Sequence, residues 1–313
     1  MGILLQVGML IVGFILLIKG ADFFVDGAAG IAKRFGIPEI IVGLTIVAIG
    51  TSAPEAAVSI TAALTGNGDI TMGNILGSNI LNILVILGVT AVIAPVAIGE
   101  STVKIEMPFL LVITILMVAL GKGGNVISRI DGVILWVFFL IYMGYLLYSA
   151  RGSMKEDTNK APEKQRPIWQ LLILTVLGMV MIVVGSDFTV DGATAIAEWA
   201  GVSQRVIGLT VVALGTSLPE LVTSATAASK GNPDIAIGNI VGSNVFNILF
   251  VVGTSALITN ITFPDSFLLD SVVNVGAVIL LMFFAFKDRR LGRVSGIVFL
   301  ACYAVYLAWI LMH

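Results

Sequence analysis

Two copies of one motif place a carboxylate side chain in the middle of a long apolar segment. Residues 43–55 read GLTIVAIGTSAPE and residues 208–220 read GLTVVALGTSLPE, so ten of the thirteen positions are identical. The copies end in Glu55 and Glu220, 165 positions apart. An ionisable side chain inside an apolar membrane segment is costly, and where one occurs it usually marks a functional site. Two of them at matching positions predict one shared site between two related halves.

Each motif also carries a proline that weakens its helix. Pro54 has no backbone N–H, so the carbonyl of Gly50 loses its helical partner, and the proline ring pushes that carbonyl aside. Pro219 has the same effect on the carbonyl of Gly215. We therefore expect two kinked helices whose freed carbonyl oxygens turn inward, with neighbouring hydroxyl groups satisfying part of the backbone.

Polar groups gather on the helix face that carries each glutamate, and a second polar stripe follows one helix later. Helical spacing places Ala48, Thr51, Ser52 and Glu55 on or beside one face, and the second copy repeats this with Ala213, Thr216, Ser217 and Glu220. The second stripe consists of Asn74, Ser78 and Asn82, and its copy of Asn239, Ser243 and Asn247. All of these groups offer oxygen, which suits calcium and sodium, whereas zinc or copper would favour histidine or thiolate.

Structural roles compete with ion binding at several positions. A kinked packing helix whose glutamate reaches towards water explains one motif but does not explain its repetition. The asparagine and serine stripes could join helices through hydrogen bonds alone. We predict ion contact for the deepest members, Ser78, Asn82, Ser243 and Asn247, and packing or capping for Asn74, Asn79, Asn239 and Asn244. Two aspartate pairs, Asp22 with Asp26 and Asp187 with Asp191, fall near the ends of apolar segments, where we expect structural roles.

The composition places the chain in a membrane. Of its 313 residues 58% are hydrophobic and 12% are charged, and the mean hydropathy is +1.07. A soluble domain of this size cannot bury so much apolar surface. His313 is the only histidine and Cys302 the only cysteine. These counts exclude histidine-based metal sites and catalytic triads, and also an intrachain disulfide.

The pattern predicts an all-α membrane protein of ten transmembrane helices. They span residues 3–33, 38–64, 70–94, 102–121, 128–150, 167–199, 203–229, 235–258, 266–287 and 291–311. The polar segment 151–166 has the length of a linker and not of a regulatory domain. It separates a first five-helix repeat, 1–150, from a second, 167–313. Because five is odd, the second repeat must be inverted in the membrane, an architecture common among secondary transporters.

Lysine and arginine are distributed unequally between the two membrane faces. Thirteen lie on the face that includes the linker and three on the other. The positive-inside rule therefore puts the linker in the cytoplasm and both termini outside. No basic region precedes the first apolar run, so we expect no cleaved signal peptide.

The repeated motifs resemble a known family. Each Gly-Thr-Ser-x-Pro-Glu segment is followed by Gly-Asn-Ile-x-Gly-Ser-Asn-x-x-Asn. Together they resemble the two alpha-repeats of the calcium/cation antiporter superfamily, and most closely those of compact prokaryotic sodium/calcium exchangers. The resemblance covers essentially the whole chain. It implies ten helices in inverted halves and the exchange of several sodium ions for one calcium ion, with the first and sixth helices sliding outside the core.

The resemblance also implies a ligand set. Carried over by motif position, the ligands fall on Ala48, Thr51, Ser52, Glu55, Ser78 and Asn82, and on Ala213, Thr216, Ser217, Glu220, Ser243 and Asn247. The alanines, and part of the threonine contacts, act through backbone carbonyls. Some members carry aspartate where this chain has Asn247, so the formal charge of the site here is −2. That charge balances one calcium ion and leaves the coupling ion open, because proton-coupled and potassium-dependent relatives share the motifs.

We therefore predict a secondary active antiporter with no enzymatic activity and no cofactor. Its partners are calcium and sodium ions and the lipid bilayer; we expect no nucleic acid, a functional monomer, and a prokaryotic inner membrane. A calcium/proton exchanger, a potassium-dependent exchanger and a passive cation channel are the alternatives. An intramembrane hydrolase with Ser52 as nucleophile would lack a histidine base, and the sequence has no G-x-x-x-x-G-K-[ST] motif for ATP.

Overall fold

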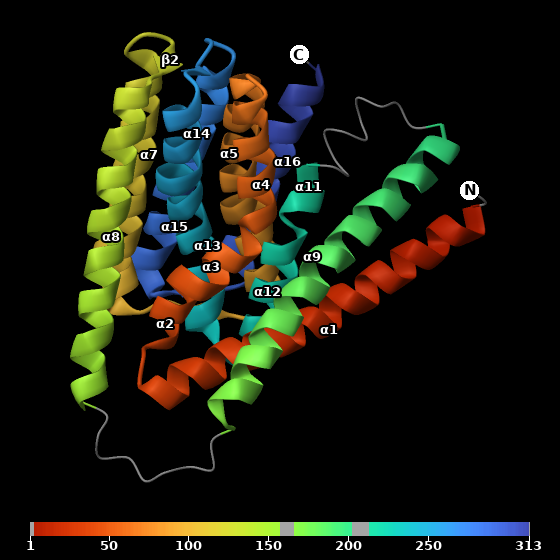
Figure 1. Ribbon diagram of the computed structural model, residues 1–313, viewed down its shortest axis with the longest axis vertical. Helices are drawn as coiled ribbons and strands as arrows, with labels where there is room; N and C mark the ends of the chain where they lie inside the picture. The colour runs from red at the N-terminus through yellow and green to blue at the C-terminus, as the bar shows by residue number, and fades with distance from the viewer. Residues whose placement is uncertain (1–2, 157–165, 202–212, 313) are drawn as a thin grey trace.

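The apolar segments fold into helices close to the predicted ones. The computed structural model describes residues 3–156, 166–201 and 213–312, and most of them are helical (Figure 1). The first half contains, in order, α1 (Ile3–Phe35), α2 (Glu39–Val42), η1 (Gly43–Val47), α3 (Ala48–Thr51), α4 (Ala53–Leu64), α5 (Gly68–Leu81), η2 (Asn82–Ile86), α6 (Leu87–Ile93), β1 (Val96–Ala97), η3 (Thr102–Glu106), α7 (Met107–Lys122), β2 (Val126–Ile127) and α8 (Arg129–Glu156), where η marks a π-helical turn.

Among the described residues, the second half follows the same order apart from η3, which has no counterpart before α15. It contains α9 (Ile168–Trp199), α11 (Ala213–Thr216), α12 (Leu218–Ser229), α13 (Pro233–Phe246), η5 (Asn247–Val252), α14 (Gly253–Ile258), β3 (Ile261–Thr262), α15 (Phe267–Asp288), β4 (Arg290–Leu291) and α16 (Arg293–Met312). The predicted helix 203–229 begins outside the described residues and continues as α11 and α12. One boundary differs from the prediction, because α8 runs on to Glu156, into the segment expected to be linker.

The helical class is confirmed. Within the described ranges, eight helices are long and apolar enough to cross a membrane, and the bent pair Glu39–Thr51 and Ala53–Leu64 would make a ninth. Ten crossings therefore remain a prediction, since the tenth includes residues 203–212. The four two-residue strands are the only β-structure among the described residues, and each lies outside the helices that could cross a membrane.

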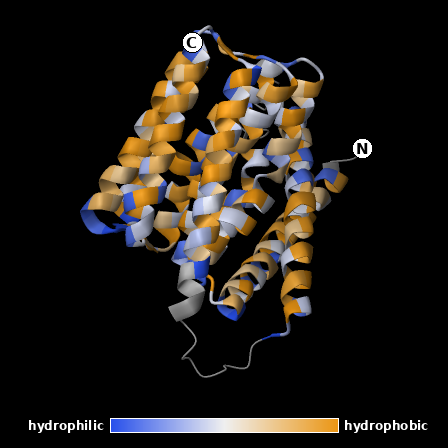
Figure 2. Cartoon of the chain, turned by 60° about the vertical axis from the view of Figure 1, so that its left-hand side comes forward, coloured by the Kyte–Doolittle hydropathy of each residue, from blue (hydrophilic) through white to orange (hydrophobic). Residues whose placement is uncertain are grey.

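Two helical runs form the centre of the bundle. The most apolar window of Pro233–Ile258 is 94% buried and that of Ile70–Ile93 is 78% buried, whereas the window of Arg293–Met312 is 17% buried. Figure 2 shows hydrophobic colour along much of the length of the outer helices, as expected for helices in contact with lipid. The central runs are α5–α6 and α13–α14, which carry the two asparagine and serine stripes.

Both motif helices break where the prolines predict. The bend between Glu39–Thr51 and Ala53–Leu64 is 52°. Ser52 lies at the break with φ −82° and ψ 7°, and Ser217 lies at its counterpart with φ −94° and ψ 2°. Each following helix has its proline in the first turn, where the missing N–H is tolerated. The predicted kinks are thus present, and after each one a new helix begins with its glutamate in the first turn.

The π-helical turns were not predicted. Two of them, η2 and η5, begin at Asn82 and Asn247, the last members of the two polar stripes. A π-turn widens the helix and is frequently found at functional sites. Their equivalent positions indicate that the two halves share this local geometry as well as the motif.

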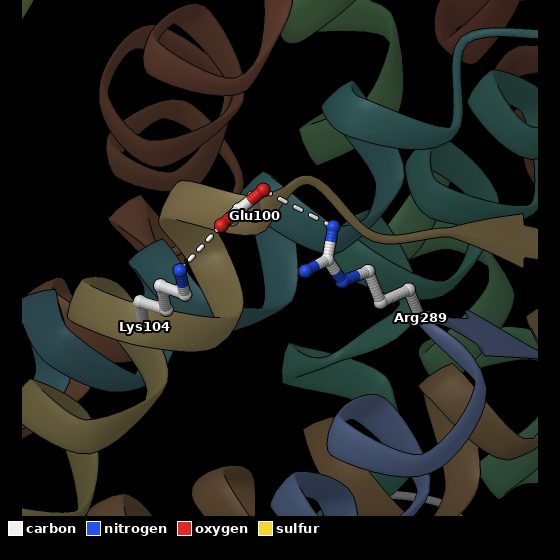
Figure 3. Close-up of polar contacts among 3 residues, drawn as sticks. All are labelled: Glu100, Lys104 and Arg289. Carbon is white, nitrogen blue, oxygen red and sulfur yellow. Dashed lines mark hydrogen bonds and ion pairs between the residues drawn. The ribbon is translucent and has the colours of Figure 1, made fainter.

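Short strands and ion pairs join the halves at both ends of the bundle. β1 pairs with β4, and β2 pairs with β3, so each two-stranded sheet contains one strand from each half. Beside β1 and β4, Glu100 forms ion pairs with Lys104 and, at 3.1 Å, with Arg289 (Figure 3). Beside β2 and β3, Lys122 forms an ion pair with Asp265. The halves are therefore tied to each other at opposite ends.

Helices α1 and α9 pack against each other as an antiparallel pair beside the remaining bundle (Figure 1). Small residues allow the close approach, because a Cβ atom placed at Gly20 would lie 2.9 Å from the carbonyl oxygen of Gly178. A Cβ atom placed at Gly192 would lie 2.9 Å from the carbonyl oxygen of Gln6. The glycines of this contact recur every seven residues, at Gly13, Gly20 and Gly27 on α1 and at Gly178, Gly185 and Gly192 on α9.

The glycines of the two central helices, Gly238 and Gly242 on α13 and Gly77 on α5, differ in how closely another helix approaches them. A Cβ atom at Gly242 would lie 2.7 Å from the Leu44 carbonyl oxygen, and one at Gly238 would lie 2.9 Å from that of Ile40. Among the described residues, nothing lies within 4 Å of a Cβ atom placed at Gly77. Helix α13 therefore lies in close contact with the segment that contains Ile40 and Leu44. For α5, the residues that repeat Ile40 and Leu44 fall in 202–212, outside the described residues.

Candidate cation-binding site between the two halves

The two motif glutamates approach each other at the breaks in the kinked helices. Both are completely buried, each in the first turn of its helix. The Ser52 hydroxyl donates a hydrogen bond of 2.9 Å to Glu220 Oε1. The Ser217 hydroxyl donates one of 3.3 Å to Glu55 Oε1. Each serine therefore serves the glutamate of the other half, and the four predicted residues form one constellation.

The second carboxylate oxygen of each glutamate has no hydrogen-bond donor among the described residues. Glu55 Oε2 and Glu220 Oε2 are buried and accept no hydrogen bond from any described residue. A buried carboxylate oxygen without a donor is unfavourable unless a cation or a proton occupies it. Chemically, these two oxygens are suited to share a hard cation.

Two asparagines hold the backbone of the glutamates in place. Asn74 Nδ2 donates to the Glu55 carbonyl oxygen at 3.2 Å, and Asn239 Nδ2 donates to that of Glu220 at 3.4 Å. Each amide also reaches a serine one turn further along, Ser59 or Ser224, at 2.9 Å. These contacts are those of packing residues, as the sequence analysis expected for this asparagine pair.

The threonines of the two motifs differ in their surroundings. Thr51 is buried, donates to Asn239 Oδ1 at 2.9 Å, and has its hydroxyl 3.3 Å from the Ala48 carbonyl oxygen. Thr216 is half-buried and lines a cavity of about 630 Å³ between α4, α9 and α11. Ala213 begins α11, directly after residues outside the described part. The second motif is therefore more open than the first.

The deep members of the polar stripes lie where the halves meet. Ser78, Asn82, Ser243 and Asn247 are all buried. Asn82 Nδ2 donates to Asn244 Oδ1 at 2.9 Å, and Asn247 Nδ2 donates to Asn79 Oδ1 at 3.2 Å. The side-chain oxygens of Asn82 and Asn247 have no hydrogen-bond partner among the described residues. Each stripe thus offers one amide oxygen, while its amide nitrogen links the halves.

One freed carbonyl does not turn inward as predicted. The Gly215 carbonyl oxygen accepts a hydrogen bond of 2.7 Å from the hydroxyl of Ser186 on α9. The proline frees this carbonyl, but it faces the neighbouring helix. The sequence analysis missed this donor, since the position in α1 that repeats Ser186 is Ala21, which has no hydroxyl group.

Two further, partly buried contacts were also missed. Tyr145 donates to Glu106 Oε1 at 2.6 Å, and Tyr306 donates to Asp270 Oδ1 at 2.7 Å. The two carboxylates lie 164 positions apart, close to the spacing of the motifs. Because no repeated run of residues surrounds them, sequence inspection gave no signal for them beyond that spacing.

Within the described ranges, no group of three His, Cys, Asp or Glu side chains converges on one point. A cation at the centre would therefore depend on two carboxylates together with neutral oxygens from hydroxyl, amide and carbonyl groups. Such a donor set excludes soft metals and fits sodium or calcium.

Known proteins resemble this chain in both sequence and fold. The family described as sodium/calcium exchanger protein matches residues 5–148 and 170–312. The chain is 31% identical to the sodium/calcium exchanger MaX1 of Methanosarcina acetivorans over 336 aligned positions, covering 95% of this chain and 96% of that protein. It is 38% identical to the inner membrane protein YrbG of Escherichia coli over 263 positions, covering 82% and 81%. A solved structure of the sodium-calcium exchanger NCX_Mj superposes with a TM-score of 0.83 at 35% identity, covering 97% and 98%.

Proposed function

The chain belongs to the sodium/calcium exchanger family, and from that premise we propose that it is a secondary active antiporter that exchanges sodium ions for calcium. Glu55 and Glu220 bind the two kinds of cation in turn, and alternating access carries them across the membrane. No cofactor and no chemical reaction are required. The transported ions are the substrates.

One observation carries this proposal above the others, namely the crossed hydrogen bonds between the motifs. Because Ser52 bonds Glu220 and Ser217 bonds Glu55, each carboxylate is oriented by the opposite half. Each keeps one oxygen without a donor among the described residues. A cation held between these oxygens therefore contacts both halves at once, so a single site can serve the ions whichever face is open.

We assign the ligands from both halves by the same positions. They are Ala48, Thr51, Ser52, Glu55, Ser78 and Asn82, with Ala213, Thr216, Ser217, Glu220, Ser243 and Asn247. The alanines contribute backbone carbonyls. Asn82 and Asn247 contribute the side-chain oxygens that lack a partner among the described residues.

The charge of this set explains why the ions compete. Two carboxylates neutralise one calcium ion, and the same charge is shared when sodium ions replace it. Bringing both kinds of cation into the site at once would leave an excess positive charge in a medium of low dielectric constant, which is strongly unfavourable. Binding of one kind therefore favours release of the other.

The architecture that we propose has ten transmembrane helices in two inverted five-helix repeats, 1–150 and 167–313, joined by 151–166. The reciprocal pairing of strands and the reciprocal serine bonds support it. The protein lies in a lipid bilayer, which we take to be a prokaryotic inner membrane, acts as a monomer, and has both termini outside. Helices α1 and α9 slide past the core to open one face at a time.

Calcium flux into proteoliposomes tests this function. Vesicles loaded with sodium and diluted into sodium-free medium containing radioactive calcium should accumulate calcium above its equilibrium level. Replacing internal sodium by potassium or choline, or imposing a pH gradient without sodium, should leave only background uptake. Accumulation driven by protons alone, or dependent on potassium, would identify the corresponding exchanger instead, and equilibration without accumulation would identify a passive channel.

A further inference from the structure

Two aspartate pairs occupy repeat-equivalent positions on the outer helices but have different surroundings. Asp22 and Asp26 lie on α1, and Asp187 and Asp191 lie 165 positions further on, on α9. Lys230, at the end of α12, places its ammonium 3.2 Å from Asp22 Oδ1 and 2.8 Å from Asp26 Oδ1. It also donates a hydrogen bond of 3.1 Å to the Asp22 carbonyl oxygen. One lysine thus ties α1 to the motif helix of the second half.

The equivalent place in the other half is a cavity. Asp187 and Asp191 line the space of about 630 Å³ that also includes Pro54 and Thr216. The residue that repeats Lys230 is Thr65, whose hydroxyl bonds the carbonyl oxygens of its own helix at 3.1 Å. The first half therefore has a short, neutral side chain where the second half has a long cation.

The packing of the outer helices follows this difference. Ser186 and Val190 of α9 line the cavity. The α1 residues that repeat them, Ala21 and Val25, are completely buried. Helix α1 is held against α12 at the end where Lys230 lies. At the opposite end α9 contacts α11 through Ser186 but borders the cavity with Asp187 and Asp191.

We propose that Lys230 is a positioning residue that clamps α1 onto α12 and keeps the linker face of the protein closed while the opposite face is open. This inference rests on the proposed alternating access. The face opened in this structure leads towards Thr216, next to the serine that orients Glu55. Releasing the clamp allows α1 to move away from the core, and α9, which packs along α1, moves towards it.

The clamp contributes a modest bias, because its three side chains are 30–43% exposed. Exposed and half-exposed ion pairs of this kind change a two-state ratio by about three- to tenfold. That range is large enough to move the balance of an exchanger between its two open states and small enough to be reversed in each cycle.

Cysteine labelling tests the clamp without relying on transport. Single cysteines at Val25 and at Val190, each in a Cys302→Ala background, report the two faces in purified protein reconstituted in lipid nanodiscs. Lys230→Thr, which copies the residue of the first half, should speed labelling at position 25 by about three- to tenfold and slow labelling at position 190. Lys230→Arg should restore both rates. Lys104→Thr is the matched control, since its ion pair with Glu100 lies within a single helical segment, and it should change neither rate.

Unchanged labelling at both positions in Lys230→Thr would overturn the proposal. Should that variant not fold, Asp26→Asn removes the shorter of the two ion pairs and should change the rates in the same direction, and a failure to do so overturns the clamp equally. The two proposals fail separately. Altered labelling without sodium-driven calcium uptake by the unmodified protein would remove the exchanger function and keep the clamp, whereas normal uptake with unchanged labelling would do the reverse.

Discussion

Single residues decide the charge of the central site. Glu55 and Glu220 lie in the helix turns that follow the two breaks, and both are completely buried. Water cannot compensate there for the loss of a charge. The effect of each substitution should therefore depend on the carboxylate itself and much less on the shape of the side chain, which Gln preserves.

We expect that Glu55→Gln and Glu220→Gln each abolish calcium uptake into sodium-loaded vesicles. Either change removes half of the negative charge, and a loss of about 3 kcal/mol weakens cation binding more than a hundredfold. The matched control is Glu100→Gln, which changes an exposed glutamate at the start of a helical segment and should transport normally. Uptake near the unmodified level by either inserted and folded site variant would contradict the assignment.

The sequence predicted these residues because they are repeated, and it missed those whose partners are remote in the chain. The motif glutamates, their serines and the stripe asparagines occur twice, in runs that match at ten of thirteen and at seven of ten positions. By contrast, Tyr145 and Glu106 are 39 positions apart and meet only after α7 and α8 pack. The same holds for the pairing of Lys230 with Asp26, since residue types alone do not show which helix ends meet.

At the scale of helices, the kinks followed from proline chemistry, and the π-turns did not. Pro54 and Pro219 remove a backbone donor wherever they stand in a helix, so the breaks at Ser52 and Ser217 were predictable. A π-turn at Asn82 or Asn247 depends on packing across the whole bundle. It has no local residue signature comparable to a proline.

The contact between α1 and α9 should be sensitive to side-chain size at its glycines. Gly20→Leu inserts atoms where a Cβ alone would lie 2.9 Å from a backbone oxygen, and overpacking of this kind costs about 1–3 kcal/mol. We expect a lower melting temperature and reduced transport. Gly8→Leu on the same helix is the control, because no described atom lies within 4 Å of a Cβ placed there. Equal melting temperatures for the two variants would show that the glycines do not set this contact.

For the molecule as a whole, the two ends of the bundle differ in charge and in the strand pairs and ion pairs that join the halves there. Figure 1 shows the chain termini towards one end and the helix ends that flank 157–165 at the other. The thirteen-to-three asymmetry of lysine and arginine predicts that the linker end lies in the cytoplasm. The overall class and the repeat were predictable, because hydropathy and the number of segments determine them. Which face is open and which is closed could not be predicted from the sequence, since that depends on how α1 and α9 pack against the core.

Labelling of intact cells tests the orientation. In a Cys302→Ala background, a cysteine in place of Lys33 should be protected from an impermeant thiol reagent added outside, and one in place of Asn125 should be labelled. Both side chains are exposed in the structure. Labelling at position 33 with protection at position 125 would invert the proposed topology, and permeabilised cells should label both.

The ion pairs of Glu100 and Asp265, at the two ends of the bundle, should weaken in acid. The hydrogen bond from Lys104, with the nearby charge of Arg289, lowers the pKa of Glu100, and the Lys122 ammonium lowers that of Asp265. A depressed folded-state pKa gives stability that is present above the ordinary carboxyl value of about 4 and is lost as the pH falls through the folded value. Glu100→Gln should therefore lower the melting temperature slightly at neutral pH, by about 1–2 °C. The difference should disappear on acidification, with Asp265→Asn following the same course. A difference in melting temperature between variant and unmodified protein that increased in acid would contradict the ion-pair explanation.

The glycine contact between α1 and α9 also bears on leakage through the carrier. Backbones that touch along two helices of 33 and 32 residues should make the pair move as one body relative to the core. Movement that uncovers one face then covers the other, whether or not an ion is bound. A state open to both sides would require the two helices to separate, which the packing opposes along its whole length. The barrier to ion leak is therefore mechanical, and ion occupancy needs only to regulate when the pair moves.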